Sequence, residues 1–254
     1  HLFTHAMFKA LLFLGAGAVI HFIHSNEMKD MGGLRKYLPV AHITFLIACL
    51  AIAGVPPFAG FFSKEEILLA AYHNNPAIYY IALVTSGITA FYMFRLYFSI
   101  FWNKPAVLSA QRGHEAHHKQ PIAINLPLII LAIGAALAGF IPFSEFISSD
   151  GTPYHSNFHP AFSIPPVAIG VIGIVFAWWL YQKQNDRPEQ IANAVSALYK
   201  AAYRKFYIDE IYLFITKKIL FNLVGRPAAW FDRTIVDGMV NVTGNATQII
   251  STGI

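Results

Sequence analysis

The chain has 254 residues and a formal net charge of +5; 56% of its residues are hydrophobic and only 12% are charged. Soluble domains carry about 25% charged residues, so this composition argues against a soluble globular protein and indicates a membrane protein. The basic residues are scattered over the connections between apolar runs, which argues against a nucleic-acid-binding surface. The single cysteine, Cys49, excludes a disulfide framework within the chain.

Apolar runs of about 20 residues, the length needed to cross a bilayer as a helix, recur along the first part of the chain. We expect membrane spans at 2–23, 40–72, 78–101, 122–146 and 164–181. The second is too long for one straight crossing, and its middle holds Pro56, Pro57 and Gly60, where proline removes amide donors and glycine loosens the helix. We therefore expect two half-helices joined by an unwound link, which a membrane tolerates only inside protein or beside a watery cavity.

The pattern changes after residue 183. Residues 184–254 mix apolar and charged positions, and the stretches 207–218 and 230–237 are typical of amphipathic helices that lie along a membrane surface. A short sixth crossing near 211–224 is the alternative, although two adjacent lysines interrupt it. The predicted fold is all-α: a polytopic membrane helix bundle of about five transmembrane helices, one of them broken, over residues 1–183, followed by an amphipathic lateral helix.

The distribution of lysine and arginine predicts the orientation in the membrane. Basic residues occur in the connections 25–38 and 103–121 and after the last span, whereas 73–77 and 147–163 contain none. Positively charged loops stay on the cytoplasmic side. We expect a multi-pass protein of a bacterial inner (plasma) membrane, with the lysine-rich loops and the lateral helix on its cytoplasmic face.

Lys64 is a charged residue in an apolar segment that we expect to lie in the membrane. An ionisable side chain at membrane depth costs about 2.5–3.5 kcal/mol on insertion scales, so its presence points to function. Removal from water favours a neutral amine, whereas a nearby carboxylate, such as that of Glu65, favours the ammonium. A lysine between these influences can load and release a proton. The alternative is a lysine that snorkels to the bilayer surface.

His1, His5 and Lys9 follow one another at four-residue spacing, which places them on one stripe of the first expected helix. Such a stripe can relay protons. Structural polar packing is one alternative, and a zinc-binding histidine pair is another. Because no carboxylate lies between the two histidines, the zinc-protease pattern is absent, and we predict no metal site.

Motifs for cofactors are missing from the sequence. It contains no glycine-rich nucleotide fingerprint, no P-loop and no set of cysteines for an iron–sulfur cluster. We therefore expect no redox site and no cofactor in this chain.

Residues 1–14, 31–36 and 54–68 together resemble the second half of the antiporter-like subunits of respiratory complex I, and the likeness extends over about 1–102. The weaker segment 200–237 resembles the start of the long lateral helix of the distal antiporter-like subunit, the one that the family numbers fifth. The resemblance implies two inverted five-helix repeats, each with a broken helix, of which this chain would hold most of the second. We expect it to be a fragment of a longer protein.

The resemblance also implies roles for particular residues. Lys9 matches the central lysine of the family, and His1 and His5 match the histidines that precede it. Lys64 matches the lysine of the second broken helix, and Glu65 the acidic residue that follows it. All five are expected to take part in proton translocation.

The expected function is proton translocation within NADH:quinone oxidoreductase, driven by redox chemistry in partner subunits. Those partners would hold NADH, FMN, iron–sulfur clusters and quinone. The resemblance implies contacts with other membrane subunits, especially the adjacent antiporter-like subunits through the lateral helix, and with the lipid bilayer. A subunit of a multi-subunit sodium/proton antiporter is one alternative. A structural brace of a membrane complex, whose buried charges only hold helices together, is another.

Overall fold

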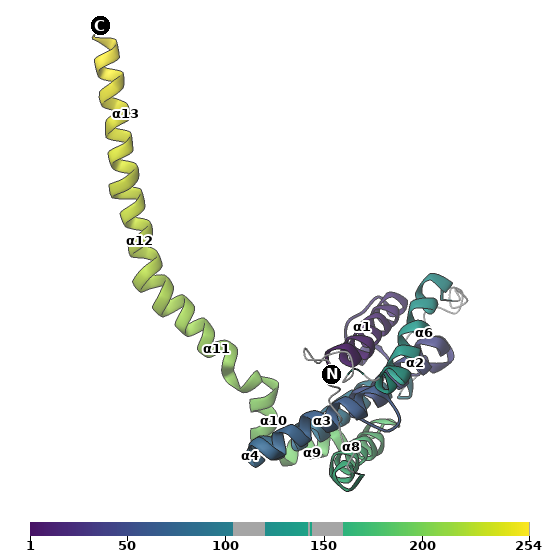
Figure 1. Ribbon diagram of the computed structural model, residues 1–254. Helices are drawn as coiled ribbons and strands as arrows, with labels where there is room; N and C mark the ends of the chain where they lie inside the picture. Colours follow the sequence, from purple (N-terminus) through teal and green to yellow (C-terminus); the bar gives the residue numbers. More distant parts are fainter. Residues whose placement is uncertain (104–119, 142, 144–159, 254) are drawn as a thin grey trace. The chain divides into compact units, whose positions relative to one another are not determined.

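The computed structural model describes residues 1–103, 120–141, 143 and 160–253, and every regular element in them is a helix. The chain forms two compact units, His1–Pro188 and Glu189–Ile254, which are described separately. The predicted all-α class is confirmed (Figure 1).

The first unit contains the helices that are long and apolar enough to cross a membrane. Among the described residues these are α1 (Leu2–Ile23), α4 (Pro76–Phe101), α6 (Ile122–Leu137) with its 3-10 extension η3 (Ala138–Phe140), and α8 (Pro160–Tyr181). They confirm four of the five expected spans. The last residues of the expected span 122–146, and most of the connections 103–121 and 147–163, lie outside the described residues.

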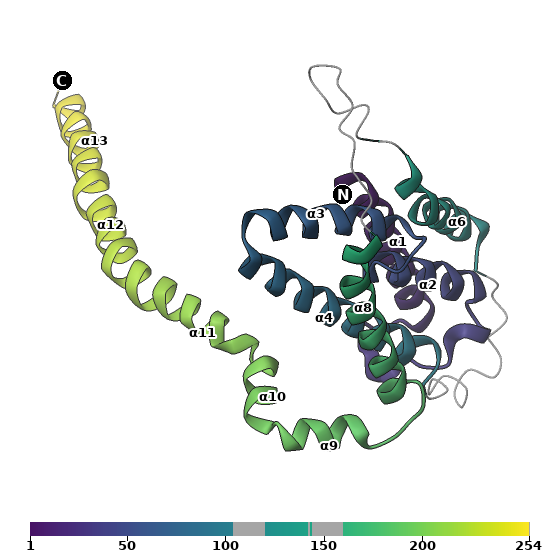
Figure 2. The same ribbon diagram turned by 60° about the horizontal axis from the view of Figure 1, so that its bottom comes forward.

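The remaining span is broken, as the sequence predicts. Helix α2 (Pro39–Ala53) and helix α3 (Ala59–Asn74) are joined by the non-helical link 54–58, which holds Pro56 and Pro57 (Figure 2). Gly60, by contrast, lies inside α3 rather than in the link. A helix that ends at mid-span leaves carbonyl groups without helical partners, and these need other donors.

Link amides satisfy two of those carbonyls. Gly54 takes a left-handed conformation with φ of 78°, and its amide donates to the carbonyl of Ala51 at 3.0 Å. The amide of Val55 donates to the carbonyl of Leu50 at 3.1 Å. These are the two bonds of a Schellman motif, which favours glycine because a Cβ is strained at positive φ.

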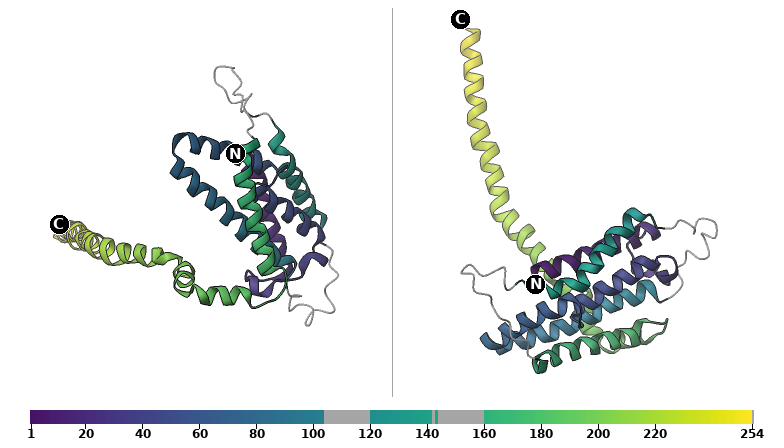
Figure 3. Two further views of the ribbon diagram at one scale, coloured as in Figure 1. Left: turned by 90° about the horizontal axis from the view of Figure 1, so that it is seen from below. Right: turned by 45° about the vertical axis from the view of Figure 1, so that its right-hand side comes forward.

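Neighbouring helices of the first unit share one apolar core. Helix α1 packs on α2, α2 on α4, and α4 on α8, while α6 covers α1 and α2 (Figure 3). Leu11, Phe45, Phe101 and Leu128, from four of these helices, are at most 1% exposed. Helices α4 and α8 approach each other closely, since a Cβ at Gly173 would lie 2.6 Å from a backbone oxygen of α4. Small residues allow such contacts between membrane helices.

The connection between α1 and α2 contains two short 3-10 helices, η1 (Met28–Asp30) and η2 (Leu34–Lys36). Both contact α4. The guanidinium of Arg35 lies over the Trp102 ring, 3.9 Å from the ring centroid. The basic connection 25–38 is therefore fixed to the end of the bundle where α4 ends.

The second unit consists of helices. Its elements are α9 (Arg187–Ala194), α10 (Ser196–Tyr203), η4 (Lys205–Tyr207), α11 (Ile208–Leu213), η5 (Phe214–Gly225), α12 (Arg226–Phe231), η6 (Asp232–Val236) and α13 (Asp237–Thr252). The first two residues of α9 belong to the first unit. From α11 to α13 they form one continuous rod with π-helical stretches at η5 and η6 (Figure 1). The predicted helices at 207–218 and 230–237 lie within it. Residues 211–224 are not among the membrane-crossing candidates of the described residues.

A corner separates this rod from α10. Lys205, Phe206 and Tyr207 have positive φ values of 52°, 55° and 58°. The ammonium of Lys205 donates to the carboxylate of Asp209 at 2.6 Å, and this hydrogen bond, with the negative charge, raises the pKa of Lys205. Both side chains are exposed, so the pair adds little to stability.

Candidate functional site

Lys64 binds the end of the half-helix α2. Its ammonium donates to the carbonyl oxygen of Ile52 at 2.6 Å. Ile52 is in the last turn of α2, where carbonyl groups lack helical donors and the helix dipole is negative. The helix break therefore creates the acceptor that holds the lysine.

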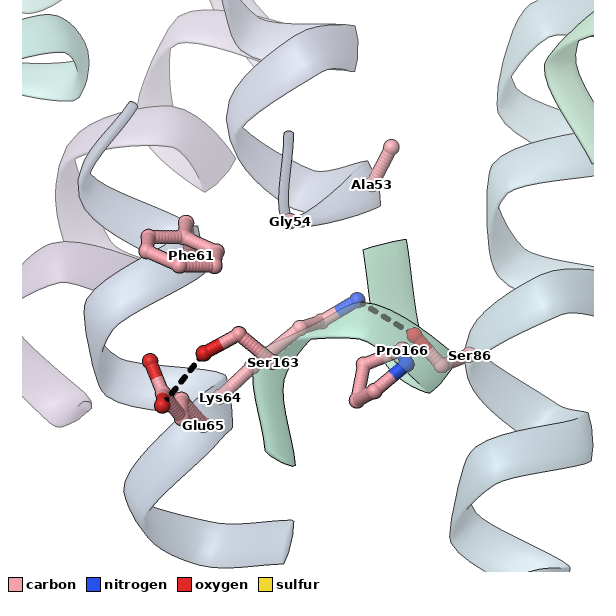
Figure 4. Close-up of a pocket in the computed structure, with 8 residues that line it drawn as sticks. All are labelled: Ala53, Gly54, Phe61, Lys64, Glu65, Ser86, Ser163 and Pro166. Atoms are coloured by element: carbon pink, nitrogen blue, oxygen red, sulfur yellow. Dashed lines mark hydrogen bonds between the residues drawn. The ribbon is translucent and has the colours of Figure 1, made fainter. Parts of the chain in front are cut away.

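The same ammonium reaches a third helix. Lys64 also donates to the hydroxyl oxygen of Ser86 on α4 at 3.3 Å, and Figure 4 shows the lysine pointing toward that hydroxyl. A Cβ at Gly54 would lie 3.2 Å from Cδ of Lys64, so this glycine leaves room for the lysine stem. The charged end of Lys64 thus lies between α2 and α4. We call Lys64, the Ile52 carbonyl and Ser86 the lysine cluster.

Glu65 bonds to a different helix from the two that Lys64 contacts. Its side chain is 8% exposed, and its Oε1 accepts a hydrogen bond from the hydroxyl of Ser163 on α8 at 2.5 Å (Figure 4). No ion pair joins Glu65 to Lys64 in the described part of the chain. The following carboxylate, Glu66, is exposed. Glu65 therefore ties α3 to α8 rather than neutralising the neighbouring lysine.

A small cavity of about 10 Å³ lies between these groups. Its lining combines the charged and hydroxyl side chains with apolar ones: Ala53, Gly54, Phe61, Lys64, Glu65, Ser86, Ser163 and Pro166. A cavity of this size is about the smallest that holds one water molecule. The sequence predicted a break that is either buried in protein or beside a watery cavity, and the structure places this small cavity, with polar and apolar lining, next to the break.

The histidine stripe of α1 meets α3 through hydroxyl groups. Nδ1 of His1 lies 2.9 Å from the hydroxyl of Ser63, and the hydroxyl of Thr4 donates to the same Ser63 oxygen at 3.0 Å. The rings of His1 and His5 are 5.6 Å apart between centroids. Ser63 directly precedes Lys64, so the start of the stripe contacts the turn of α3 that carries the lysine, while the two side chains bond to different helices.

Lys9, the last member of the stripe, lies apart from these contacts. It is half-buried on α1, two turns beyond His1, and no hydrogen bond or ion pair joins it to the rest of the described chain. The structure thus joins His1 to α3 and places the His5 ring beside His1, but it leaves Lys9 outside this network.

Sequence reasoning missed the hydroxyl groups that connect the charged residues. Thr4, Ser63, Ser86 and Ser163 are each at most 9% exposed. Each is a polar residue within an apolar helix, and Ser63 adjoins the conspicuous Lys64. That signal was available, but hydroxyls in helices commonly bond to their own backbone, so the sequence does not show which ones reach another helix.

Metal ligands do not gather in the part of the chain that the structure describes: no three His, Cys, Asp or Glu side chains there lie close enough to hold an ion.

Comparison with known proteins gives consistent matches. Residues 1–89 match the family described as NADH:quinone oxidoreductase/Mrp antiporter, TM. The whole chain is similar to the NAD(P)H-quinone oxidoreductase chain 5 of Picosynechococcus sp., at 36% identity and over 44% of that protein. It is 38% identical to the chloroplastic subunit 5 of Chlorokybus atmophyticus (96% of this chain, 40% of that protein). It is 34% identical to NADH-quinone oxidoreductase subunit L of Neisseria meningitidis (96% of this chain, 43% of that protein).

The fold and the site define a polytopic helical membrane protein with a broken helix and a lysine held between helices. The similarities then identify the family: the chain belongs to the antiporter-like membrane subunits of quinone oxidoreductases, of the chain 5 or subunit L type. The resemblance stated from the sequence is confirmed. The chain spans less than half the length of the curated relatives it matches.

Proposed function

We propose that this chain is part of a proton-translocating membrane subunit of a quinone oxidoreductase, and that Lys64 is a proton-loading residue. The observation that carries the proposal is the surroundings of the Lys64 ammonium, which is bound to a carbonyl and a hydroxyl but, among the residues that the structure describes, to no carboxylate. An amine that has lost its proton can still donate to both oxygens. Both protonation states of Lys64 therefore keep their hydrogen bonds, which suits a group that gains and loses protons repeatedly.

His1, His5, Lys9 and Glu65 are proposed to serve Lys64. The hydroxyl of Ser63, which bonds to His1, can accept one hydrogen bond and donate another at the same time. It can therefore pass a proton along the stripe. Glu65, bonded to α8, can alter the charge near the lysine when it takes up a proton. Lys9 would exchange protons with His5 and His1 after water or a movement of α1 connects them.

Energy for transport must come from outside this chain. Moving one elementary charge against 100 mV costs about 2.3 kcal/mol. Partner subunits that bind NADH, FMN, iron–sulfur clusters and quinone would supply it, and no cofactor is proposed for this chain. The rod of the second unit, from α11 to α13, carries exposed apolar side chains and would contact neighbouring antiporter-like subunits as the lateral helix.

The basic connection 25–38 supports an orientation with that end of the bundle on the cytoplasmic side of a bacterial inner membrane, or on the equivalent side of an organelle membrane. Quinone oxidoreductases are favoured over sodium/proton antiporters because the similarity to quinone oxidoreductase subunits covers the whole chain, second unit included.

Replacing Lys64 with alanine in the full-length protein is the direct test. We expect several-fold less proton translocation per quinone reduced, with the complex still assembled, because the loading group is lost. Proton uptake into liposomes containing the purified complex gives the measurement. Lys183→Ala, which removes an exposed lysine, is the matched control and should behave like the wild type.

Unchanged translocation in the Lys64→Ala complex would contradict the proposal. A structural brace would give a different pattern: translocation would survive the combined loss of Lys9, His5 and Lys64, but assembly would fail when the second unit is truncated.

A further inference from the structure

A second polar cluster lies in the same interface between α2 and α4, near its other end. Nε2 of His42 on α2 lies 2.7 Å from the hydroxyl oxygen of Tyr97 on α4. The indole N–H of Trp102 donates to that same oxygen at 3.2 Å. His42 is half-buried, whereas Tyr97 is 3% exposed. Because Arg35 lies over Trp102, the cluster adjoins the basic connection 25–38.

The positions of the two clusters follow from the antiparallel packing of α2 and α4. Three contacts cross this interface in order: His42 with Tyr97, Cys49 with the Met93 carbonyl at 3.8 Å, and the Ile52 carbonyl with Ser86 through Lys64. Ten residues of α2 separate the first contact from the last, or about 15 Å along the helix. His42 and the lysine cluster thus occupy two levels of one interface.

The chemistry of the His42–Tyr97 pair suits proton exchange. A neutral imidazole can accept from the tyrosine hydroxyl at Nε2, and a protonated imidazole can donate to the hydroxyl oxygen. Histidine changes charge near physiological pH, unlike other unperturbed side chains. The indole N–H of Trp102 donates to the Tyr97 oxygen and holds that oxygen in place while the O–H bond can still turn, and Arg35 is the positive charge next to the cluster. The pair can therefore switch between two hydrogen-bonded protonation states without moving a helix.

The stretch between the two clusters is apolar and closed. Phe45 and Cys49 on α2, with Ala90 and Met93 on α4, are all at most 6% exposed. A proton moves directly only over hydrogen-bond distances, so crossing about 15 Å requires water to enter this stretch. Polar groups at both ends with packed side chains between them form an interface that can connect or isolate the two clusters.

We propose that the His42–Tyr97 pair exchanges protons with the water at the end of the bundle that carries connection 25–38, and hands them to or takes them from Lys64. The proposal rests on the proposed function of Lys64. His42 gains and loses one proton in each exchange. One proton from water binds Nε2 of His42 and the Tyr97 hydroxyl turns. One proton then leaves His42 toward water in the opened stretch. No electron or covalent bond is involved.

The test compares His42→Gln and Tyr97→Phe with Lys64→Ala, each in the full-length protein within its assembled complex in liposomes. Glutamine can keep a hydrogen bond to Tyr97 but does not titrate, so a structural role alone would leave transport intact. We expect His42→Gln to lower protons translocated per quinone reduced several-fold, with assembly unchanged, and Tyr97→Phe to lower it less. A fall in Lys64→Ala with wild-type values in both new variants would overturn the inference and leave the proposed function standing. No fall in any of them would overturn both.

Chemical rescue separates proton exchange from packing. His42→Ala leaves a space in which added imidazole can bind, and imidazole should restore translocation measured with a dye that responds to membrane potential. Pyrazole has the same shape but takes up no proton near neutral pH, and it should not restore translocation. Equal restoration by both molecules would show that His42 only fills space and would overturn the inference.

Discussion

Lys64→Arg is expected to abolish most proton translocation while leaving the positive charge in place. Arginine does not release its proton in proteins, so it cannot load and unload one. Its planar guanidinium also cannot bind the Ile52 carbonyl and Ser86 in the way the compact ammonium does. We expect several-fold fewer protons per quinone reduced, similar to the effect of Lys64→Ala.

The comparison between these two variants identifies what the lysine supplies. If Lys64 acted only as a fixed charge, Lys64→Arg would retain most translocation and Lys64→Ala would lose it. Proton uptake into liposomes distinguishes these outcomes, and the amount of assembled complex after purification shows whether the larger side chain disturbs folding. Near-normal translocation in a well-assembled Lys64→Arg complex would refute proton loading at this residue.

Gly60→Ala is expected to destabilise the protein by about 3 kcal/mol, the upper part of the range for overpacked sites. A Cβ at this position would lie 1.9 Å from the carbonyl oxygen of Ala51 and 2.8 Å from its carbon. These are backbone atoms at the end of α2, so no side chain can turn aside to make room. The two half-helices would have to separate, which would also displace Ile52 from Lys64.

Gly17→Ala is the matched control because its Cβ would have no neighbour within 4 Å. Alanine in the middle of α1 changes stability by less than about 1 kcal/mol, in the stabilising direction. Thermal unfolding of the purified full-length protein in detergent, together with the yield of assembled complex, measures both effects. Equal stability of the two variants would show that α2 and α3 do not meet as closely as the structure indicates.

Much of the fold could be predicted from the sequence because membrane spans depend on local composition. A run of about 20 apolar residues must form a helix in lipid, since unpaired backbone groups are too costly there. The break at Pro56 and Pro57 followed from the same local chemistry. Gly60 was assigned to the break for its conformational freedom, whereas in the structure it serves close packing inside α3.

The candidate site was predictable only in part. Lys64, the residue that marks the site, was evident from the sequence as a charge in an apolar segment. Its partners were not, because Ile52 contributes a backbone carbonyl and Ser86 lies on another helix. The sequence did not indicate a role for His42, because a lone histidine near the start of a helix has no local pattern that distinguishes it. Its partner Tyr97 is 55 positions away in the chain.

The sequence by itself therefore determined the class of the protein, the spans, the helix break and the charge that needs a partner, because each depends on composition within one segment. Only the tertiary structure decided which groups meet: Lys64 with the end of α2 and Ser86, Glu65 with Ser163 rather than with its neighbour Lys64, and His42 with Tyr97. The physical reason is that such contacts depend on the rotation and register of packed helices. Those are fixed by close approaches such as the one at Gly60, which no single segment encodes.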